Sequence, residues 1–264
     1  MKWSPPDRMR RICSLAGLTY VIGLRDRIFV SLMLLGVALL GVSLLLGMLG
    51  VGESTAVLRN AGLAGVELTG VLLVIFTVVF NWSRERESRM RDIYLTIVSR
   101  EGYLAGKALG YLALLTLYCA LAAAGLCLLW FPNGALSARA LAALYPMFLK
   151  LALVMGCTLV VCLIFRSSFV ALCAGVFVYV NSEMIGSALT LVRHKGSHGG
   201  ALLLQGLYHL LPHLDLLDAK GPAAYAEALP DGFFWRGTLY SLAYGLCLYL
   251  IACSVFKTRH GEWS

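Results

Sequence analysis

The stretch that decides the fold is residues 28–50, IFVSLMLLGVALLGVSLLLGMLG, which contains no charged side chain. An α-helix rises about 1.5 Å per residue and the hydrocarbon core of a bilayer is about 30 Å thick, so roughly 20 apolar residues cross it. This stretch is therefore predicted to be a transmembrane helix. It is too long for the apolar core of a cleaved signal peptide, and no small-residue cleavage pattern follows it.

Further segments of similar length and apolarity predict an all-α, polytopic membrane protein with six transmembrane helices. The composition agrees, because 59% of the 264 residues are hydrophobic and only 14% are charged, well below the charged fraction of an average soluble domain. We expect residues 1–264 to form a single transmembrane domain. The other five predicted helices cover residues 60–82, 108–138, 140–165, 167–192 and 237–256.

The distribution of lysine and arginine predicts the orientation, because these residues concentrate in short cytoplasmic segments. With both termini inside, the inner segments carry 15 Lys and Arg residues and the outer segments carry 6. We therefore expect a multi-pass protein of the bacterial inner (cytoplasmic) membrane with its N- and C-termini in the cytoplasm. The same clustering beside membrane segments accounts for the net charge of +8 without a nucleic-acid partner.

Two segments outside the predicted spans have amphipathic patterns. Residues 7–27, within the N-terminal segment 1–27, are basic at both ends and apolar between, which indicates either a helix lying in the inner interface or a simple basic anchor. Residues 193–233 carry a leucine stripe interrupted by a proline, and we expect this extracytoplasmic segment to lie along the outer interface or to re-enter the membrane. His209 and His213 have helical spacing, but a third metal ligand is missing, so no metal site is predicted. The eight cysteines show no C-x-x-C pairing and are expected to pack as small apolar residues.

The loop between the second and third predicted helices, residues 83–107, is the most charged part of the chain and yet contains an apolar cluster around Ile93, Tyr94 and Leu95. A short helix with one apolar face and many charges is suited to docking into a groove on another protein. The other interpretation is a solvated loop whose arginines only fix the topology.

Within residues 84–110, an acidic–basic run is followed by an Ile-Tyr apolar patch and then by a Ser-Arg element that ends in Leu-x-Gly-Lys. This arrangement resembles the corresponding loop of ABC-2-type transporter permeases, the membrane subunits of ATP-binding-cassette exporters. The sequence departs from that family where Ile97-Val98-Ser99 lacks the Lys-Pro or Arg-Pro turn that usually precedes the Ser-Arg element. The matching residues are Glu85, Glu87, Arg91, Ile93, Tyr94, Ser99, Arg100, Tyr103, Leu104, Gly106 and Lys107.

The resemblance implies a permease that pairs with a second permease chain, as a homodimer or a heterodimer, and seats its loop helix on a separate ATPase subunit. ATP would be bound by that partner: the chain has no G-x-x-x-x-G-K-[ST] motif, so we expect neither an enzyme nor a bound cofactor. Lys107 is expected at the start of helix three, facing anionic lipid headgroups. The residues assigned to ATPase coupling are Glu87, Arg91, Ile93, Tyr94, Leu95, Arg100 and Tyr103.

Two charges inside the predicted spans are expected to pair. Lys150 lies 16 residues before the predicted inner turn at Arg166, and Glu183 lies 17 residues after it. At about 1.5 Å per residue, both side chains are roughly 24 Å from that turn, so they lie at the same depth on adjacent helices. The ion pair either fixes helix register or lines the route of a polar substrate. Glu67 is expected about two turns from the outer face, where water reaches it.

The leading interpretation is the permease subunit of an ATP-driven exporter, whose substrate the sequence does not indicate. The second is a non-transporting membrane subunit that relays the ATPase stroke to a periplasmic or lipid-linked partner through residues 193–233. A secondary transporter is less consistent with the sequence, because no inverted repeat is evident. An intramembrane enzyme would need paired acids or a Ser/Lys dyad within the spans, and neither is present.

Overall fold

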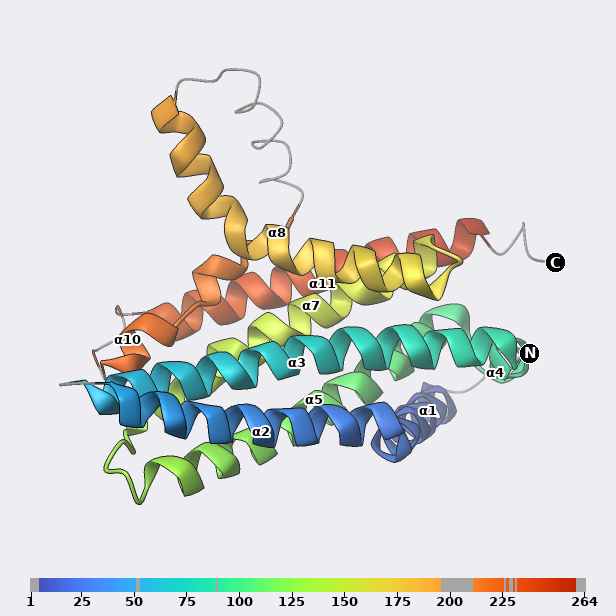
Figure 1. Cartoon of the computed structure of the whole chain (residues 1–264). Helices are drawn as coiled ribbons and strands as arrows, with labels where there is room; N and C mark the ends of the chain where they lie inside the picture. Colours follow the sequence, from blue (N-terminus) through green and yellow to red (C-terminus); the bar gives the residue numbers. More distant parts are fainter. Residues whose placement is uncertain are drawn as a thin grey trace.

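A computed structural model of the chain describes residues 5–50, 53–88, 90–195, 211–225, 227, 230 and 232–259. Regular structure in these residues is entirely helical, and five helical segments are long and apolar enough to cross a membrane. Figure 1 shows them running side by side along one axis. The protein is therefore an all-helical, multi-pass membrane protein. The five segments are α2 (Arg27–Leu49), α3 (Ser54–Glu87), α5 (Arg100–Trp130), the stretch Ala138–Ile164, and Phe233–Thr258 within α11 (Phe233–Arg259).

The sixth predicted crossing corresponds to α8 (Ser168–Lys195), whose side chains are described as far as Met184; that part, Ser168–Met184, is apolar but shorter than the other five segments. The helix begins alongside the bundle, then bends so that its last turns leave it (Figure 1). Among the residues that the structure describes, five segments are therefore long and apolar enough to cross a membrane, and the sixth crossing stays a prediction.

Local sequence explains where several helices begin and end. The Asp26 carboxylate accepts a hydrogen bond from the backbone N–H of Ile28 at 3.2 Å and caps α2, while Ser99 caps α5 by accepting from the N–H of Gly102 at 3.3 Å. A turn at Pro132-Asn133-Gly134 follows α5, with Gly134 at φ +62°, a conformation that favours glycine. The segment Ala138–Ile164 is divided into α6 (Ala138–Ala142) and α7 (Leu144–Ile164).

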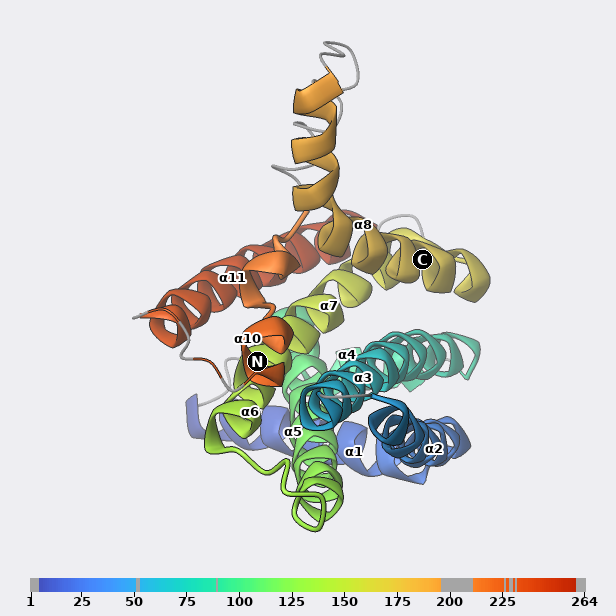
Figure 2. The ribbon, with the colours of Figure 1, turned by 60° about the vertical axis from the view of Figure 1, so that its left-hand side comes forward.

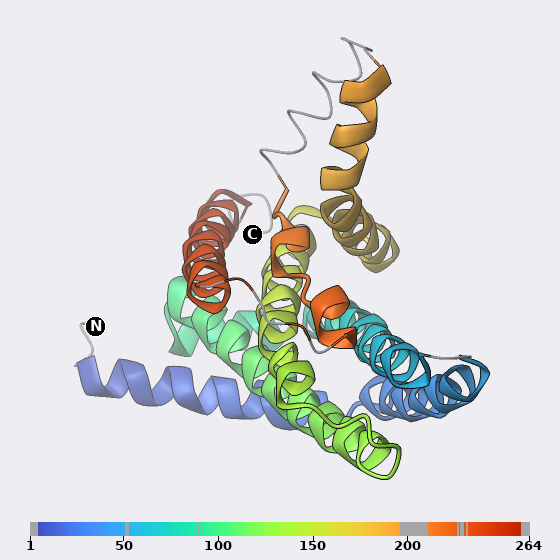
Figure 3. The same ribbon diagram turned by 90° about the vertical axis from the view of Figure 1, so that its left-hand side faces the viewer.

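Helix α1 (Pro5–Arg25) lies across the bundle instead of along it, at the end that also carries α4 (Met90–Ile97) (Figures 1 and 3). We call this end of the bundle the α4 end. Three glycines spaced four residues apart on α5 allow α1 to approach closely. A Cβ atom on Gly110 would lie 2.6 Å from Thr19 Cβ and 2.7 Å from the Ala16 carbonyl oxygen, so no larger residue fits there without a shift of α1. The three are Gly102, Gly106 and Gly110.

At the opposite end, residues 211–225 fold back onto the bundle, and we call them the cap segment. It contains the 3₁₀-helix η1 (Leu214–Leu217), which packs on α7 and α8, and α10 (Lys220–Ala224), which packs on α3 and α6 (Figure 2). Leu214 and Leu217 are fully buried. Arg59 of α3 donates hydrogen bonds to the carbonyl oxygens of Ala135 (2.6 Å) and Ala224 (3.3 Å). This part of the 193–233 segment is therefore integrated into the helical core, whereas residues 196–210, including His209, lie outside the described residues.

Candidate functional site

Four charged side chains from four helices meet inside the bundle near the cap segment, and we call them the buried charge cluster: Glu67 of α3, Lys150 of α7, Glu183 of α8 and Lys220 of α10. Lys150 Nζ lies 2.5 Å from Glu67 Oε1 and 2.5 Å from Glu183 Oε2. Lys220 Nζ lies 2.6 Å from Glu67 Oε2 and 3.8 Å from Glu183 Oε1. Each lysine therefore faces both carboxylates, and the four charges sum to zero.

The inner members of the cluster are withdrawn from solvent. Lys150 is 1% exposed and Glu67 is 3% exposed, whereas the side chains of Glu183 and Lys220 are about one-quarter exposed. The Tyr179 hydroxyl donates a hydrogen bond to Glu67 Oε1 at 3.1 Å, and its ring lies 6.0 Å from Lys150 Nζ. Removing charges from water is costly unless partners and hydrogen bonds compensate them, and here several contacts do so.

The structure brings the predicted pair Lys150 and Glu183 together, as their equal depth indicated. It also corrects the expectation for Glu67, which lies against two lysines and is not reached by water. Lys220 was overlooked because residues 193–233 were assigned to an outer surface. The amphipathic pattern of the cap segment was the one feature of the sequence that could have pointed to Lys220. Spacing along the chain, however, cannot relate a segment after α8 to the depth of a residue in α3.

Lys220 lies outside the predicted spans, and its environment raises its pKa above the usual 10.5. Burial alone lowers the pKa of this ammonium group, but the hydrogen bond to Glu67 and the attraction of Glu67, Asp218 and Glu183 outweigh burial. Asp218 Oδ2 lies 3.7 Å from Lys220 Nζ. Lys220 is therefore positively charged at neutral pH and holds the cap segment to α3 by electrostatic attraction.

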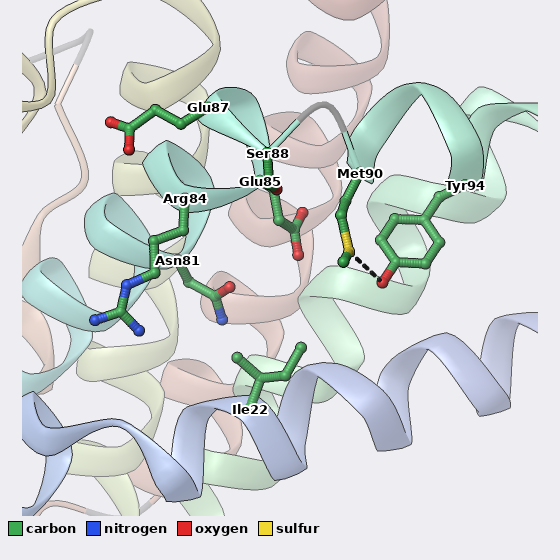
Figure 4. Close-up of a pocket in the computed structure, with 8 residues that line it drawn as sticks. All are labelled: Ile22, Asn81, Arg84, Glu85, Glu87, Ser88, Met90 and Tyr94. Atoms are coloured by element: carbon green, nitrogen blue, oxygen red, sulfur yellow. Dashed lines mark hydrogen bonds between the residues drawn. The ribbon is translucent and has the colours of Figure 1, made fainter.

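At the α4 end, the predicted loop helix corresponds to α4. The side chains of Met90 and Ile93 are exposed (49% and 59%), whereas Tyr94 is half-buried. A pocket of about 490 Å³ separates α4 from α1 and the end of α3 (Figure 4). In this view the Tyr94 hydroxyl points to Met90 Sδ, at 3.7 Å. The pocket is lined by Ile22, Asn81, Arg84, Glu85, Glu87, Ser88, Met90 and Tyr94.

Beneath α4, a buried polar and aromatic cluster joins three long helices. The Tyr94 ring stacks on the Tyr103 ring at 6.3 Å, and Tyr103 stacks on Phe256 of α11 at 6.1 Å. The Tyr103 hydroxyl donates to Glu85 Oε2 at 2.5 Å, and the Lys107 ammonium forms an ion pair with the same carboxylate. These contacts fix α4 to α3, α5 and α11.

Two expectations for this region are corrected by burial. Lys107 is 1% exposed and paired with Glu85, so it does not face lipid headgroups. Tyr103 is fully buried, so it cannot itself touch a protein docked on the surface and belongs to the base beneath α4. Glu87, Ile93 and Arg100 are exposed, as surface contacts require. The side chains of Arg91 and Leu95 lie outside the described residues.

In comparisons with known proteins, no protein-family model matches the chain and no curated protein is significantly similar to it in sequence. What the structure itself establishes is a multi-pass, all-helical membrane protein that encloses a four-membered charge cluster near its cap segment and presents a short helix at the opposite end.

Proposed function

We propose that this protein is the permease subunit of an ATP-driven ABC exporter, which forms the membrane pathway and couples through α4 to a separate ATPase subunit. The proposal rests on the resemblance of residues 84–110 to the coupling loop of ABC-2-type permeases. The position of α4 supports it, because this helix lies at the end of the bundle with α1 and the last turns of α11 (Figure 1). Under the predicted orientation, that end faces the cytoplasm, where an ATPase would bind.

The observation that carries the proposal is the contrast between the two sides of α4. Ile93 is 59% exposed and Met90 is 49% exposed, so α4 presents apolar side chains on its outer side. Tyr94, next to Ile93, is anchored through Tyr103 to Glu85 and Phe256. The inner side of α4 is thus fixed to the long helices, and its outer side is apolar. Such a helix is suited to docking into a groove on a partner, and a displacement of α4 would be passed directly to the long helices.

A second permease chain would cover apolar surface that the single chain leaves exposed. Helix α2 buries little of its length, and Leu34, Val37 and Leu45 are each more than 60% exposed. Lipid covers such a surface equally well, so pairing is part of the proposal and depends on the experiment below.

The test is affinity purification of the chain from its native membrane in mild detergent, followed by identification of bound proteins and an ATPase assay. Ile93→Asp places a charge on the exposed face of α4 without touching its base. Phe131→Asp, at an exposed apolar site (76%, against 59% for Ile93) after α5 at the other end of the bundle, is the matched control. We expect an ATPase with a phosphate-binding loop to co-purify with wild type and with Phe131→Asp, and to be lost by at least ten-fold with Ile93→Asp.

Recovery of folded wild-type protein with no ATPase would overturn the proposal and favour a secondary transporter or a scaffold. Equal loss in both variants would show that the charge harms the protein in general, and would remove α4 as the docking element.

A further inference from the structure

The two lysines of the buried charge cluster are held in different ways. Lys150 comes from the middle of the membrane-spanning helix α7 and is 1% exposed. Lys220 comes from α10, a five-residue helix in the cap segment, and its side chain is 24% exposed. Without Lys220, the remaining charges of Glu67, Glu183 and Lys150 sum to −1, so one carboxylate would lack a counter-charge.

We propose that Glu67 and Glu183, set beside Lys150, form a receptor for one cationic group, and that the chain's own Lys220 occupies this receptor in the structure. The ligand class is a primary ammonium or a guanidinium group on a small molecule or lipid. Such a group takes the place of the Lys220 ammonium when the cap segment withdraws, and the cluster stays neutral in both states.

The geometry around Lys220 Nζ fits this ligand class. Two receptor carboxylates face the nitrogen, with Glu67 Oε2 at 2.6 Å and Glu183 Oε1 at 3.8 Å. Asp218 Oδ2, at 3.7 Å, belongs to the cap segment and withdraws together with Lys220. An ammonium group has three N–H donors and no acceptor, so it can donate hydrogen bonds to several carboxylates at once. The positive charge of Lys150 beside the receptor opposes a divalent ion, whereas one further positive charge completes neutrality.

The receptor gives the proposed exporter a substrate class. This link rests on the proposed function: cargo carrying a positive charge would displace Lys220, and displacement would release the cap segment from α3. The receptor itself rests only on the charge cluster, so it is tested without an ATPase and without transport.

The experiment is chemical rescue of Lys220→Ala, purified in lipid nanodiscs and followed by its thermal transition. Truncation leaves a buried carboxylate uncompensated, so we expect Tm to fall by roughly 5–10 °C. Millimolar n-butylammonium, which restores both the alkyl stem and the charge, is expected to recover at least half of that loss. The uncharged analogue n-butanol is expected to recover none. Lys257→Ala, at an exposed pair with Glu101, is the control and should show neither effect.

A second variant separates the receptor from a general defect. Lys220→Ala combined with Glu183→Gln balances the charges inside the bundle, because Glu67 then faces Lys150 alone; Asp218, which also loses its partner, is about one-third exposed to water. We expect it to be more stable than Lys220→Ala and indifferent to n-butylammonium. The proposal is overturned if Lys220→Ala melts like wild type, if n-butanol rescues as well as the amine, or if the double variant responds to the amine. Should Lys220→Ala be recovered only when n-butylammonium is present during purification, that requirement is itself the rescue.

Discussion

Lys150 touches carboxylates from two different helices, and the other lysine beside them, Lys220, is about one-quarter exposed. Glu67 and Glu183 each face both lysines, and Tyr179 adds a hydrogen bond to Glu67. Substituting one member of such a network leaves an uncompensated charge in a medium of low dielectric constant. The stability of the fold at this depth is therefore a property of the set of residues and not of any single pair.

Lys150→Met tests this statement directly. We expect the free energy of unfolding to fall by about 3–5 kcal/mol, because the variant leaves the buried carboxylates with only Lys220 as a counter-charge. Denaturant unfolding in detergent micelles measures the change. Adding Glu183→Gln to Lys150→Met should return part of the loss. A single variant as stable as wild type would show that water or lipid headgroups already neutralise the cluster.

The raised pKa of Lys220 sets a pH dependence. A lysine whose pKa is higher in the folded protein stabilises the fold fully below its unfolded value of about 10.4, and this contribution is lost as pH rises through the folded value. The difference in Tm between wild type and Lys220→Met should therefore be constant from about pH 7 to 9 and shrink only as pH rises above the unfolded value of about 10.4. A difference that shrinks between pH 6 and 8 would contradict the assignment to Lys220.

Sequence reasoning found Lys150 and Glu183 because both are measured along the chain from the same turn. It could not find Lys220, since no spacing rule connects the cap segment to the depth of Glu67. Lys107 was placed wrongly for a related reason. Its partner, Glu85, lies across the α4 loop, and a lysine near a helix start is indistinguishable in sequence from one that faces headgroups.

Among the elements, α1 depends most visibly on its neighbour. The glycine face of α5 permits a crossing in which Thr19 and Leu15 of α1 are buried, although Met9 and Val21 of the same helix stay exposed. Small residues at such crossings allow backbones to approach and gain packing contacts. The spacing G-x-x-x-G-x-x-x-G over residues 102–110 is visible in the sequence. It overlaps the stretch that was interpreted from its charged and apolar residues, so the close crossing with α1 was not predicted.

Gly110→Ala should therefore destabilise the protein by about 1–3 kcal/mol, because the added methyl group meets Thr19 and the Ala16 carbonyl. Gly41→Ala is the matched control: it lies in the middle of α2, and a Cβ there would meet nothing within 4 Å. Thermal unfolding of both variants in the same detergent measures the difference. Equal melting temperatures would mean that α1 shifts freely on α5 and is not held at this crossing.

The number and order of the five long helices followed from the lengths of the apolar runs, since each overlaps a predicted span. The boundaries differ, and α5 begins at Arg100, eight residues before the predicted start of that span. A short helix in the charged loop was also anticipated from the apolar cluster within it and is present as α4, whereas its docking role stays a prediction. The bend of α8 and the fold of the cap segment were not anticipated, because both depend on which neighbours a helix finds in three dimensions and not on its own composition.

At the scale of the whole molecule, the lysine and arginine distribution predicts that α4 and both termini share the cytoplasm. Reporter fusions test this prediction. A fluorescent protein that folds only in the cytoplasm should be bright when fused after residue 264, and a phosphatase active only outside the cytoplasm should be active when fused after residue 225. The reverse pattern would place α4 outside and remove the ATPase from the proposed function.

Helix α3 contains 34 residues, so it is about 51 Å long, well beyond the roughly 30 Å of the hydrocarbon core. The buried charge cluster grips it at Glu67, and 20 residues further, about 30 Å away, it ends at Glu87 just before α4. Helix α3 can therefore act as a rigid lever arm that pivots where the buried charge cluster holds Glu67. A tilt of only about 10° about Glu67 would swing the α4 end by about 5 Å, and a push of that size on α4 would turn back into a small rotation at the fulcrum.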